Sequence, residues 1–260
     1  MLKKLERSHG TLDIVYKNNK LKKIYQSGCS KILIPNSYNE NNELVFINTA
    51  GGITCDDSIK VKLNLVDSNI SLSTQAAEKI YAGIGNEARI DIDISVKNSN
   101  LYWLPKELIL FNRSKLKRRI NVHLNSSSNV FFCETSIFGR KAMSEQIKNI
   151  SYSDIWNIFI NSKMKHVESI NMSNNIMNNL NNKFTLKNHA AISTILVFGP
   201  LVESIKNDLN KIIETIDNVN CELSMWDNKL IVRSIANDNY ELKKTLNSVS
   251  YTHLTLPTKA

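Results

Sequence analysis

The sequence of 260 residues lacks any apolar run that approaches the roughly 20 residues a membrane-spanning helix needs. Its first ten residues, MLKKLERSHG, lack the apolar centre of a secretion signal. No stretch rich in proline, glycine and serine divides the chain, which holds only 4 prolines and 8 glycines. We therefore expect a cytoplasmic protein with no membrane partner, built as a single domain.

Motifs for metal, redox and nucleotide chemistry are also missing. The four cysteines (Cys29, Cys55, Cys133 and Cys221) form no Cys-x-x-Cys pair, which fits neither a structural zinc site nor a redox motif. The five histidines are isolated, and there is no Gly-x-Ser-x-Gly elbow to anchor a nucleophile. No glycine-rich loop ends in Lys-Ser or Lys-Thr, which excludes a P-loop GTPase or ATPase. The sequence gives no basis for an enzyme, and we expect free thiols in a reducing compartment.

Positive charge is in excess, because 33 lysines and arginines face 24 acidic residues and give a net charge of +9. The densest basic cluster is 113–119, so a basic β-rich module that binds nucleic acid or polysaccharide is one hypothesis. However, lysine, asparagine and isoleucine are abundant throughout, as A/T-rich codons would produce. The cluster also alternates around Leu116 toward Ile120 and Val122. We favour the solvated face of a strand and expect no nucleic-acid partner.

Apolar and polar residues alternate over long segments, most clearly over 59–65 and 90–96. A period of two residues predicts half-buried β-strands. Short Asn/Ser turns separate these strands, and their anchoring residues Asn69, Asn100 and Asn129 lie 31 and 29 residues apart. After each turn comes an apolar strand that is expected to end in a polar kink, at 74–75, 105–107 and 134–136.

A fixed spacing of about 30 residues suggests stacked repeats, each a bent strand pair that buries its apolar face against its neighbours. The alternative is a plain antiparallel meander whose hairpins are similar in length. We predict a mainly β fold of stacked, bent strands, either β-solenoid-like or a sandwich, with about two α-helices near the C-terminus.

Periodicity changes in the last third of the chain. Over 201–216, apolar residues three or four apart form one stripe of an amphipathic helix. Residues 222–234 predict a hairpin that turns at Asp227 and Asn228, and a short second helix is expected over 239–246. The last ten residues, 251–260, resemble translated adapter sequence, so we predict one domain over 1–250 followed by a non-native tail.

Four phrases stand out between residues 44 and 145. They read NTAGGI at 48–53, STQAAEKIY at 73–81, WLPKELILF at 103–111 and FGRKAMSE at 138–145. In this order and at these distances they resemble the UreD (also called UreH) family of urease accessory proteins. That family typically carries a Pro-Pro-Gly-Gly stretch, then Thr-Gln-Ala-Ala-Thr-Lys-Val-Tyr, Glu-Trp-Leu-Pro-Gln-Glu-Thr-Ile-Leu-Phe and Leu-Gly-Arg-x-Ala-x-Gly-Glu. The match is weaker over 10–43, faint over 150–220, and returns at 223–233.

The resemblance implies two groups of residues. Structural residues, in turns and in the core, are expected at Gly51, Gly52, Thr74, Trp103, Pro105, Phe111 and Gly139. Polar residues within otherwise apolar strands are the candidates for a partner surface or channel: Asp57, Gln75, Lys79, Tyr81, Glu107, Arg140 and Glu145. Three neighbours, Cys55, Asp56 and Asp57, are weak candidates for metal ligands.

The chain also departs from the family pattern. Cys55-Asp56 stands where Gly-Gly is usual, Thr49-Ala50 replaces Pro-Pro, Tyr102 replaces Glu, Lys106 replaces Gln and Ser144 replaces Gly. An added Asp and Cys would suit a metal path, whereas the missing Glu puts any role carried over to position 102 in doubt.

The resemblance implies a non-catalytic scaffold for urease maturation. Such a protein binds immature urease and UreF, recruits the GTPase UreG through UreF, and helps to insert nickel. It would hold no tight cofactor, only transient nickel, because a conduit needs weak, scattered ligands. Glu107, Glu134 and Glu145 could pair as acid and base in a glycosidase. We favour the simpler interpretation that these carboxylates are polar strand ends that face a partner.

Overall fold

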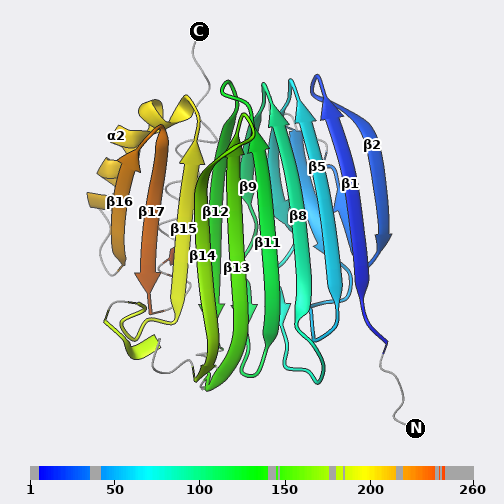
Figure 1. Ribbon diagram of the computed structural model, residues 1–260, viewed down its shortest axis with the longest axis vertical. Coiled ribbons are helices and arrows are strands. Elements are labelled where there is room, and N and C mark those ends of the chain that lie inside the picture. Colours follow the sequence, from blue (N-terminus) through cyan, green and yellow to red (C-terminus); the bar gives the residue numbers. More distant parts are fainter. Residues whose placement is uncertain are drawn as a thin grey trace.

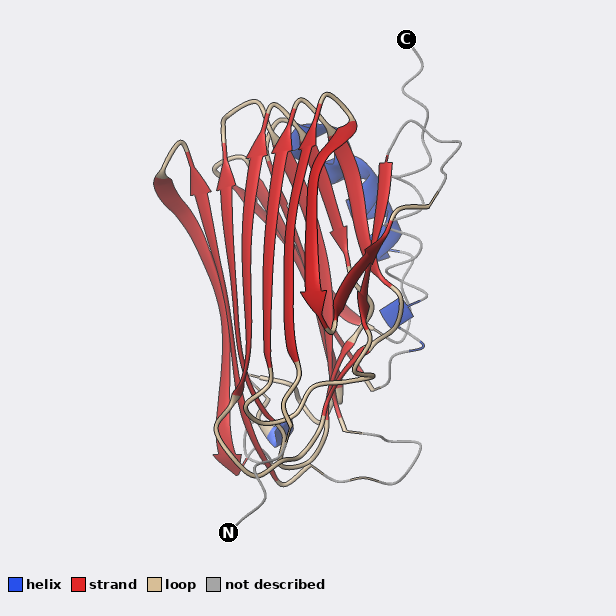
Figure 2. Cartoon of the chain, turned by 90° about the vertical axis from the view of Figure 1, so that its right-hand side faces the viewer, coloured by secondary structure: helices blue, strands red, loops and turns tan. Residues whose placement is uncertain are grey.

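The computed structural model describes residues 6–35, 42–139, 145, 147–175, 180–183, 185–214, 219–237, 240 and 242–243. Two large β-sheets lie face to face, and helix α2 (Leu201–Glu214) lies against the outer side of one of them (Figures 1 and 2). We name the sheets A and B. The prediction of a mainly β fold is confirmed.

Sheet A has seven strands, in the spatial order β14-β13-β11-β8-β5-β1-β2. Their bounds are β1 His9–Lys17, β2 Lys20–Gly28, β5 Ser58–Val66, β8 Ala88–Lys97, β11 Lys115–Leu124, β13 Asn149–Ile160 and β14 Lys163–Asn175. The five central strands, from β1 to β13, run parallel to one another, and the two edge strands pair antiparallel to their neighbours.

Sheet B has the main order β16-β17-β15-β12-β9-β6-β4-β3; in addition, the short strand β10 pairs with β12, and the short strand β7 pairs with β10. Their bounds are β3 Ser30–Leu33, β4 Asn42–Asn48, β6 Asn69–Thr74, β7 Glu78–Ile80, β9 Asn100–Leu104, β10 Leu108–Leu110, β12 Asn129–Phe138, β15 Ala191–Phe198, β16 Asn220–Trp226 and β17 Lys229–Ala236.

Successive units of the chain stack as coils. The chain passes from β5 to β6, from β8 to β9 and from β11 to β12, each time from sheet A to sheet B, and equivalent strands of neighbouring coils pair in parallel. This is the stacked, solenoid-like arrangement. An antiparallel meander would have paired the same strands in opposite directions, so that alternative is wrong.

The turn asparagines explain the 30-residue spacing. Asn69, Asn100 and Asn129 lie in register on adjacent strands, and their side chains form a ladder in which each amide Nδ2 donates to the next Oδ1 at 2.8 Å. Ladders of this kind need identical residues at identical positions in each coil. The recurrence in sequence therefore reflects a repeated contact in space.

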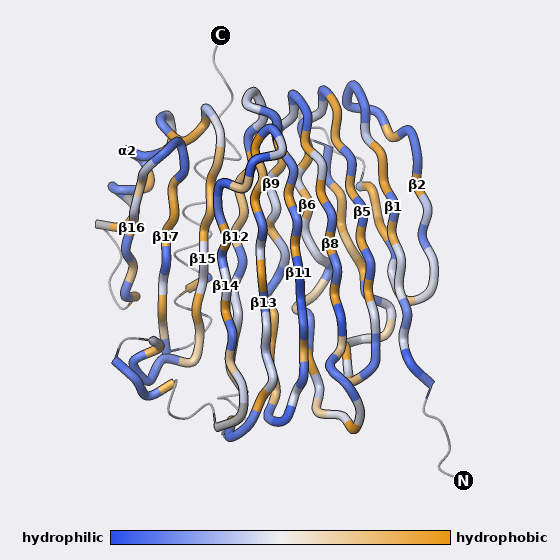
Figure 3. The backbone as a smooth tube through the Cα atoms, in the orientation of Figure 1, coloured by the Kyte–Doolittle hydropathy of each residue, from blue (hydrophilic) through white to orange (hydrophobic). Residues whose placement is uncertain are grey.

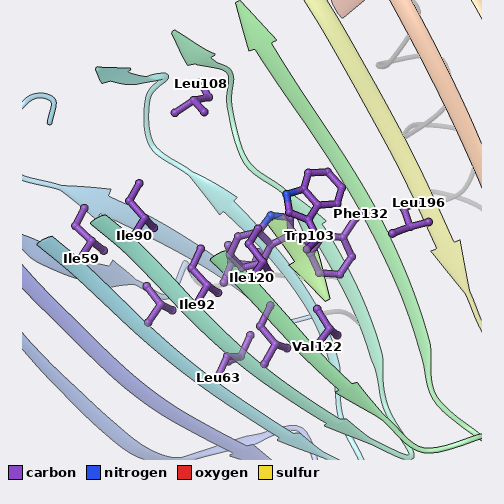
Figure 4. Packing of buried hydrophobic residues seen from close by; sticks show 14 of the residues in the cluster. Ile59, Leu63, Ile90, Ile92, Trp103, Leu108, Ile120, Val122, Phe132 and Leu196 are labelled. Atoms are coloured by element: carbon purple, nitrogen blue, oxygen red, sulfur yellow. The ribbon is translucent and has the colours of Figure 1, made fainter. Parts of the chain in front are cut away.

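The core fills the space between the sheets. Along β8 and β11, the inward positions are buried and most outward positions are exposed, and the alternation is visible as bands of hydropathy in Figure 3. Side chains from both sheets meet there, as Figure 4 shows for Ile92 and Val122 of sheet A and Phe132 of sheet B. Trp103 stacks on Phe132 with ring centroids 5.7 Å apart.

Predictions near the C-terminus can be compared with the structure only in part. The helix expected over 201–216 is α2, which ends at Glu214, and its apolar stripe packs on β15 and β17. The hairpin is confirmed, with Asp227 and Asn228 at φ of 49° and 54°, as a type I′ turn requires. Of the second helix only residues 240, 242 and 243 are described, and these are helical. The tail at 251–260 lies outside the described residues.

Two strand predictions were incomplete. Sequence reasoning missed β2 because it is exposed along almost its whole length and therefore shows no alternation. The third polar kink, at 134–136, is wrong: β12 continues through it to Phe138. This one long strand pairs with both β9 and β10, which the second kink separates. None of the helices in the described part of the chain is long and apolar enough to cross a membrane.

Candidate functional site

The four phrases singled out in the sequence come together at one corner of sheet B. Ile53 of the first phrase pairs in parallel with Ile80 of the second, which pairs with Leu110 of the third, which pairs with Phe138 of the fourth. Backbone hydrogen bonds of 2.8–3.1 Å join each of these segments to the next one. We call this set of neighbouring segments the motif corner; residues more than 80 positions apart share it.

Three of the predicted partner residues are exposed at the motif corner. Gln75 follows the end of β6, Lys79 lies in β7, and Tyr81 comes directly after β7 with 40% of its surface exposed. The Tyr81 ring lies against Phe111, with centroids 5.0 Å apart. The corner thus presents an amide, a cation and an aromatic hydroxyl on a rigid parallel ladder.

Asp57 is instead buried and serves the backbone. Its two carboxylate oxygens accept hydrogen bonds from the amides of Ser8 and Thr54, both at 2.8 Å. The neighbouring Asp56 accepts from the backbone and side chain of Asn86 at 3.1 and 2.9 Å. Both aspartates line an open polar depression at the end of sheet A, although Asp57 itself is only 5% exposed.

The proposed metal ligands do not form a cluster. Burial raises the pKa of the Cys55 thiol, which favours the neutral form over the metal-binding thiolate. Within the ranges that the structure describes, no group of three or more His, Cys, Asp or Glu side chains is placed to hold a metal ion. That Cys55, Asp56 and Asp57 bind a metal ion stays a prediction, and any metal ion bound here would be bound weakly.

The remaining polar candidates make local contacts. Glu107 is buried and pairs with Lys243 at 2.8 Å, which ties the C-terminal segment to the corner. Glu145 accepts a hydrogen bond from the Asn112 amide at 3.3 Å. Arg140 lies outside the described residues.

The residues expected to be structural occupy turns and packed positions. Thr74 Oγ1 accepts from the Lys106 amide at 2.8 Å and donates to the carbonyl of Ala76, so it fixes the kink between β6 and β7. Gly51 and Gly52 form the turn before Ile53, and a Cβ on Gly52 would lie 2.4 Å from the Tyr81 ring. Pro105 lines the interior, Trp103 and Phe111 are buried, and Gly139 adopts φ of 83° after β12.

A buried charged network that sequence reasoning missed lies behind this corner. Arg118 binds Asp154 through two hydrogen bonds of 2.9 and 2.6 Å and Glu134 through one of 2.9 Å. All three side chains are at least 93% buried. Trp103 Nε1 donates to the second oxygen of Glu134 at 2.7 Å, and Tyr152 donates to Asp154 at 3.1 Å. The network joins sheet A to sheet B through the middle of the core.

The prediction that the basic cluster at 113–119 faces solvent is wrong for Arg118. Lys117 and Arg119 do face outward, but Arg118 lies in phase with the buried Leu116 and Ile120. That phase was the signal available in the sequence, as was the position of Asp154 between Tyr152 and Trp156. Although burial disfavours the charged guanidinium, the two carboxylates raise the pKa of Arg118 above its ordinary value.

A cavity of about 60 Å³ adjoins the network inside the stack. Most of its lining is aliphatic, with the largest share from β1, β5 and β8, but Thr74, Glu78, Lys106, Arg118 and Glu134 supply polar atoms. Such a volume has room for a few water molecules, and these groups would give them partners. The interior of the stack is therefore not uniformly apolar.

Glu78 is the unusual member of this lining. It stands where the family phrase has Thr, and its Oε1 accepts from the Asn48 amide at 3.0 Å, which joins the first two phrases. Burial raises the pKa of Glu78 to about 7. A carboxyl group that changes charge near neutral pH thus faces the cavity.

Comparison with known proteins gives a consistent result. A family model described as "UreD urease accessory protein" matches residues 8–256. The chain is 33% identical over 242 residues to the urease accessory protein UreD of Rhizobium leguminosarum bv. trifolii (strain WSM2304), which covers 92% of this chain and 88% of that protein. It is 32% identical to the UreD of Agrobacterium fabrum (strain C58 / ATCC 33970) over 93% of this chain and 86% of that protein. It is 31% identical to UreD 1 of Brucella abortus biovar 1 (strain 9-941) over 93% and 89%.

Proposed function

The chain belongs to the UreD family of urease accessory proteins, and on this premise we propose that it is a non-catalytic scaffold that brings immature urease together with UreF. Through UreF it would recruit the GTPase UreG, and the assembly would insert nickel into the urease active site in the cytoplasm. The family membership itself supports a role in urease maturation.

The observation that carries the proposal is the convergence of the four phrases on one exposed corner. A fold needs turns and core residues at these positions, but it does not need Gln75, Lys79 and Tyr81 to be polar and outward-facing at the same place. Exposed polar and aromatic groups on a rigid ladder suit recognition of a protein partner, because little conformational entropy is lost on binding. We therefore assign the motif corner to partner contact.

Nickel enters the proposal as cargo. The cavity between the sheets is lined by two carboxylates, Glu78 and Glu134, and by two cations, Lys106 and Arg118, among aliphatic side chains. A passing cation would therefore meet few oxygen atoms and would not be held tightly. Arg118 pairs with Glu134 at 2.9 Å, so this carboxylate is already neutralised by a cation and would bind a metal ion weakly. This arrangement suits brief contact with a divalent ion that passes on to urease.

The direct test is capture of the partners. Tagged full-length chain, co-expressed with the cognate UreF and urease subunits, should elute with both in size-exclusion chromatography. Lys79→Glu combined with Tyr81→Ala should weaken capture of at least one partner by tenfold or more, since both side chains are exposed at the corner. Lys60→Glu is the matched control, because Lys60 is also exposed but lies on the outer face of sheet A. Failure of the folded chain to bind either partner would contradict the proposal.

A further inference from the structure

The stack of coils is uncovered at the end that carries β2 and β3. β2 is the edge strand of sheet A and β3 is the edge strand of sheet B, and both lie at the same end of the molecule, which faces the viewer in Figure 2. Among the described residues β2 pairs only with β1, so none of the described strands lies beside the other edge of its nine-residue backbone. An open strand edge is a template for pairing with another chain.

Large apolar side chains gather at this end. Of the ten large hydrophobic side chains that are exposed in the described chain, four are here: Leu21 at 37%, Ile24 at 43%, Tyr25 at 54% and Leu33 at 54%. Ile24 is in register with Ile14, so its side chain lies on the core side of sheet A. No further coil in the described part of the chain covers this side chain. Terminal units of stacked folds ordinarily carry a polar outer face, whereas here large apolar side chains are exposed among the polar ones.

Charge at this end selects among possible occupants. Residues 11–35 contain five lysines, Lys17, Lys20, Lys22, Lys23 and Lys31, and one acidic residue, Asp13, which pairs with Lys23. A second copy of the chain would bring the same lysines against these, and like charges placed opposite one another disfavour pairing. A partner segment with several carboxylates would gain from the same positions. The charge therefore disfavours self-association and favours an acidic partner.

We propose that an extended, acidic segment of a partner protein adds to β2 as a further strand, covers Leu21 and Ile24, and places its carboxylates against Lys20 and Lys22. Strand addition uses the unpaired backbone of β2 for affinity and the side chains of alternate residues for specificity. At about 3.3 Å per residue, the strand offers roughly 30 Å of edge. The motif corner begins where β2 ends, because the Thr49 amide donates to the Cys29 carbonyl at 2.8 Å. The edge of β2 gives the molecule a second docking site next to that corner.

The choice of probes rests on the proposed function: the probes are the cognate apo-urease and UreF, each added to the purified full-length chain. The wild-type chain should bind one of them with an affinity that falls steeply between 50 and 500 mM NaCl. In that complex, backbone amides of residues 20–28 should exchange hydrogen more slowly than in the free chain. Lys20→Glu with Lys22→Glu should weaken binding at least tenfold, and Ile24→Ser should weaken it as well.

The control is Lys60→Glu with Lys62→Glu, two exposed lysines on the outer face of sheet A, which should change affinity less than twofold. If a partner binds but the β2 variants bind equally well, or if β2 amides exchange as fast as in the free chain, this inference is overturned and the proposed function stands. If the wild-type chain binds neither protein, both fail. Dimerisation of the chain through β2 at low salt would also overturn it, because a second copy would then be the occupant.

Discussion

Replacing Arg118 by Met tests whether the buried network behaves as the structure indicates. The substitution removes three hydrogen bonds and leaves the carboxylates of Glu134 and Asp154 in the core without a cation. Breaking a buried ion pair in this way costs about 3–5 kcal/mol, because an uncompensated charge remains. At about 2–4 °C per kcal/mol, the melting temperature should fall by roughly 6–20 °C.

The pH dependence of this loss has a definite sign. Burial already raises the pKa of Glu134, and Arg118 opposes that rise. Without Arg118 the Glu134 carboxyl should stay protonated to higher pH, so the native state of the variant binds a proton that the unfolded state releases. The destabilisation should therefore be smaller at pH 5 than at pH 8.

Denaturant unfolding followed by circular dichroism at both pH values is the assay. Arg119→Met is the matched control: it is the next residue, faces solvent, and should change stability by less than about 0.5 kcal/mol. The triple variant Arg118→Met/Glu134→Gln/Asp154→Asn should recover a large part of the loss, since no buried charge is left. If Arg118→Met costs no more than Arg119→Met, or costs the same at both pH values, the network does not hold the sheets as described.

Three further predictions concern Glu78, the asparagine ladder, and the pair of candidates Glu107 and Arg140. The pKa of Glu78 is raised from 4.5 to about 7, so the stabilisation from its protonated form is fully present below about pH 4.5 and is lost as pH rises through 7. Glu78→Gln should therefore flatten the dependence of unfolding free energy on pH over this range. If denaturant unfolding shows the same pH dependence in the variant, Glu78 is not buried as described. Asn100→Ala breaks two ladder hydrogen bonds and should lower the free energy of unfolding by about 1–3 kcal/mol. The control Asn64→Ala, on the outer face of sheet A, should lower it by less than about 0.5 kcal/mol. Equal losses in the two variants would show that the ladder adds no stability. Glu107→Ala and Arg140→Ala should each weaken urease activation in co-expressing cells while circular dichroism shows an intact fold; unchanged activation by both would remove these residues from the site.

Much of the stack was readable from the sequence because its signals are local. Alternation over 59–65 and 90–96 places strands and their buried faces, and the spacing of Asn69, Asn100 and Asn129 gives the coil length. What sequence reasoning left open was the direction of pairing, because parallel and antiparallel neighbours give the same alternation. Strand β2 was not predicted because nearly all of its side chains are exposed, so its sequence shows no alternation of apolar and polar residues.

The candidate site was predictable only as a set of phrases. Nothing local says that residue 53 will lie beside residue 80, or residue 110 beside 138, because those contacts are made across coils. Asp57 shows the limit most clearly: a carboxylate in an apolar stretch suggests a functional surface, yet its two oxygens are occupied by backbone amides. The buried network was missed because charged residues were assigned to solvent by type, without regard to their phase along the strand.

The central claim is tested most directly in cells that express the cognate urease subunits, UreF and UreG but no other UreD-family protein. Urease purified from these cells with and without the full-length chain should be compared for bound nickel and for activity at limiting nickel. The account predicts that both rise together only when the chain is present. Urease that acquires nickel equally well without the chain, or that stays nickel-free although the chain is folded and expressed, would contradict it.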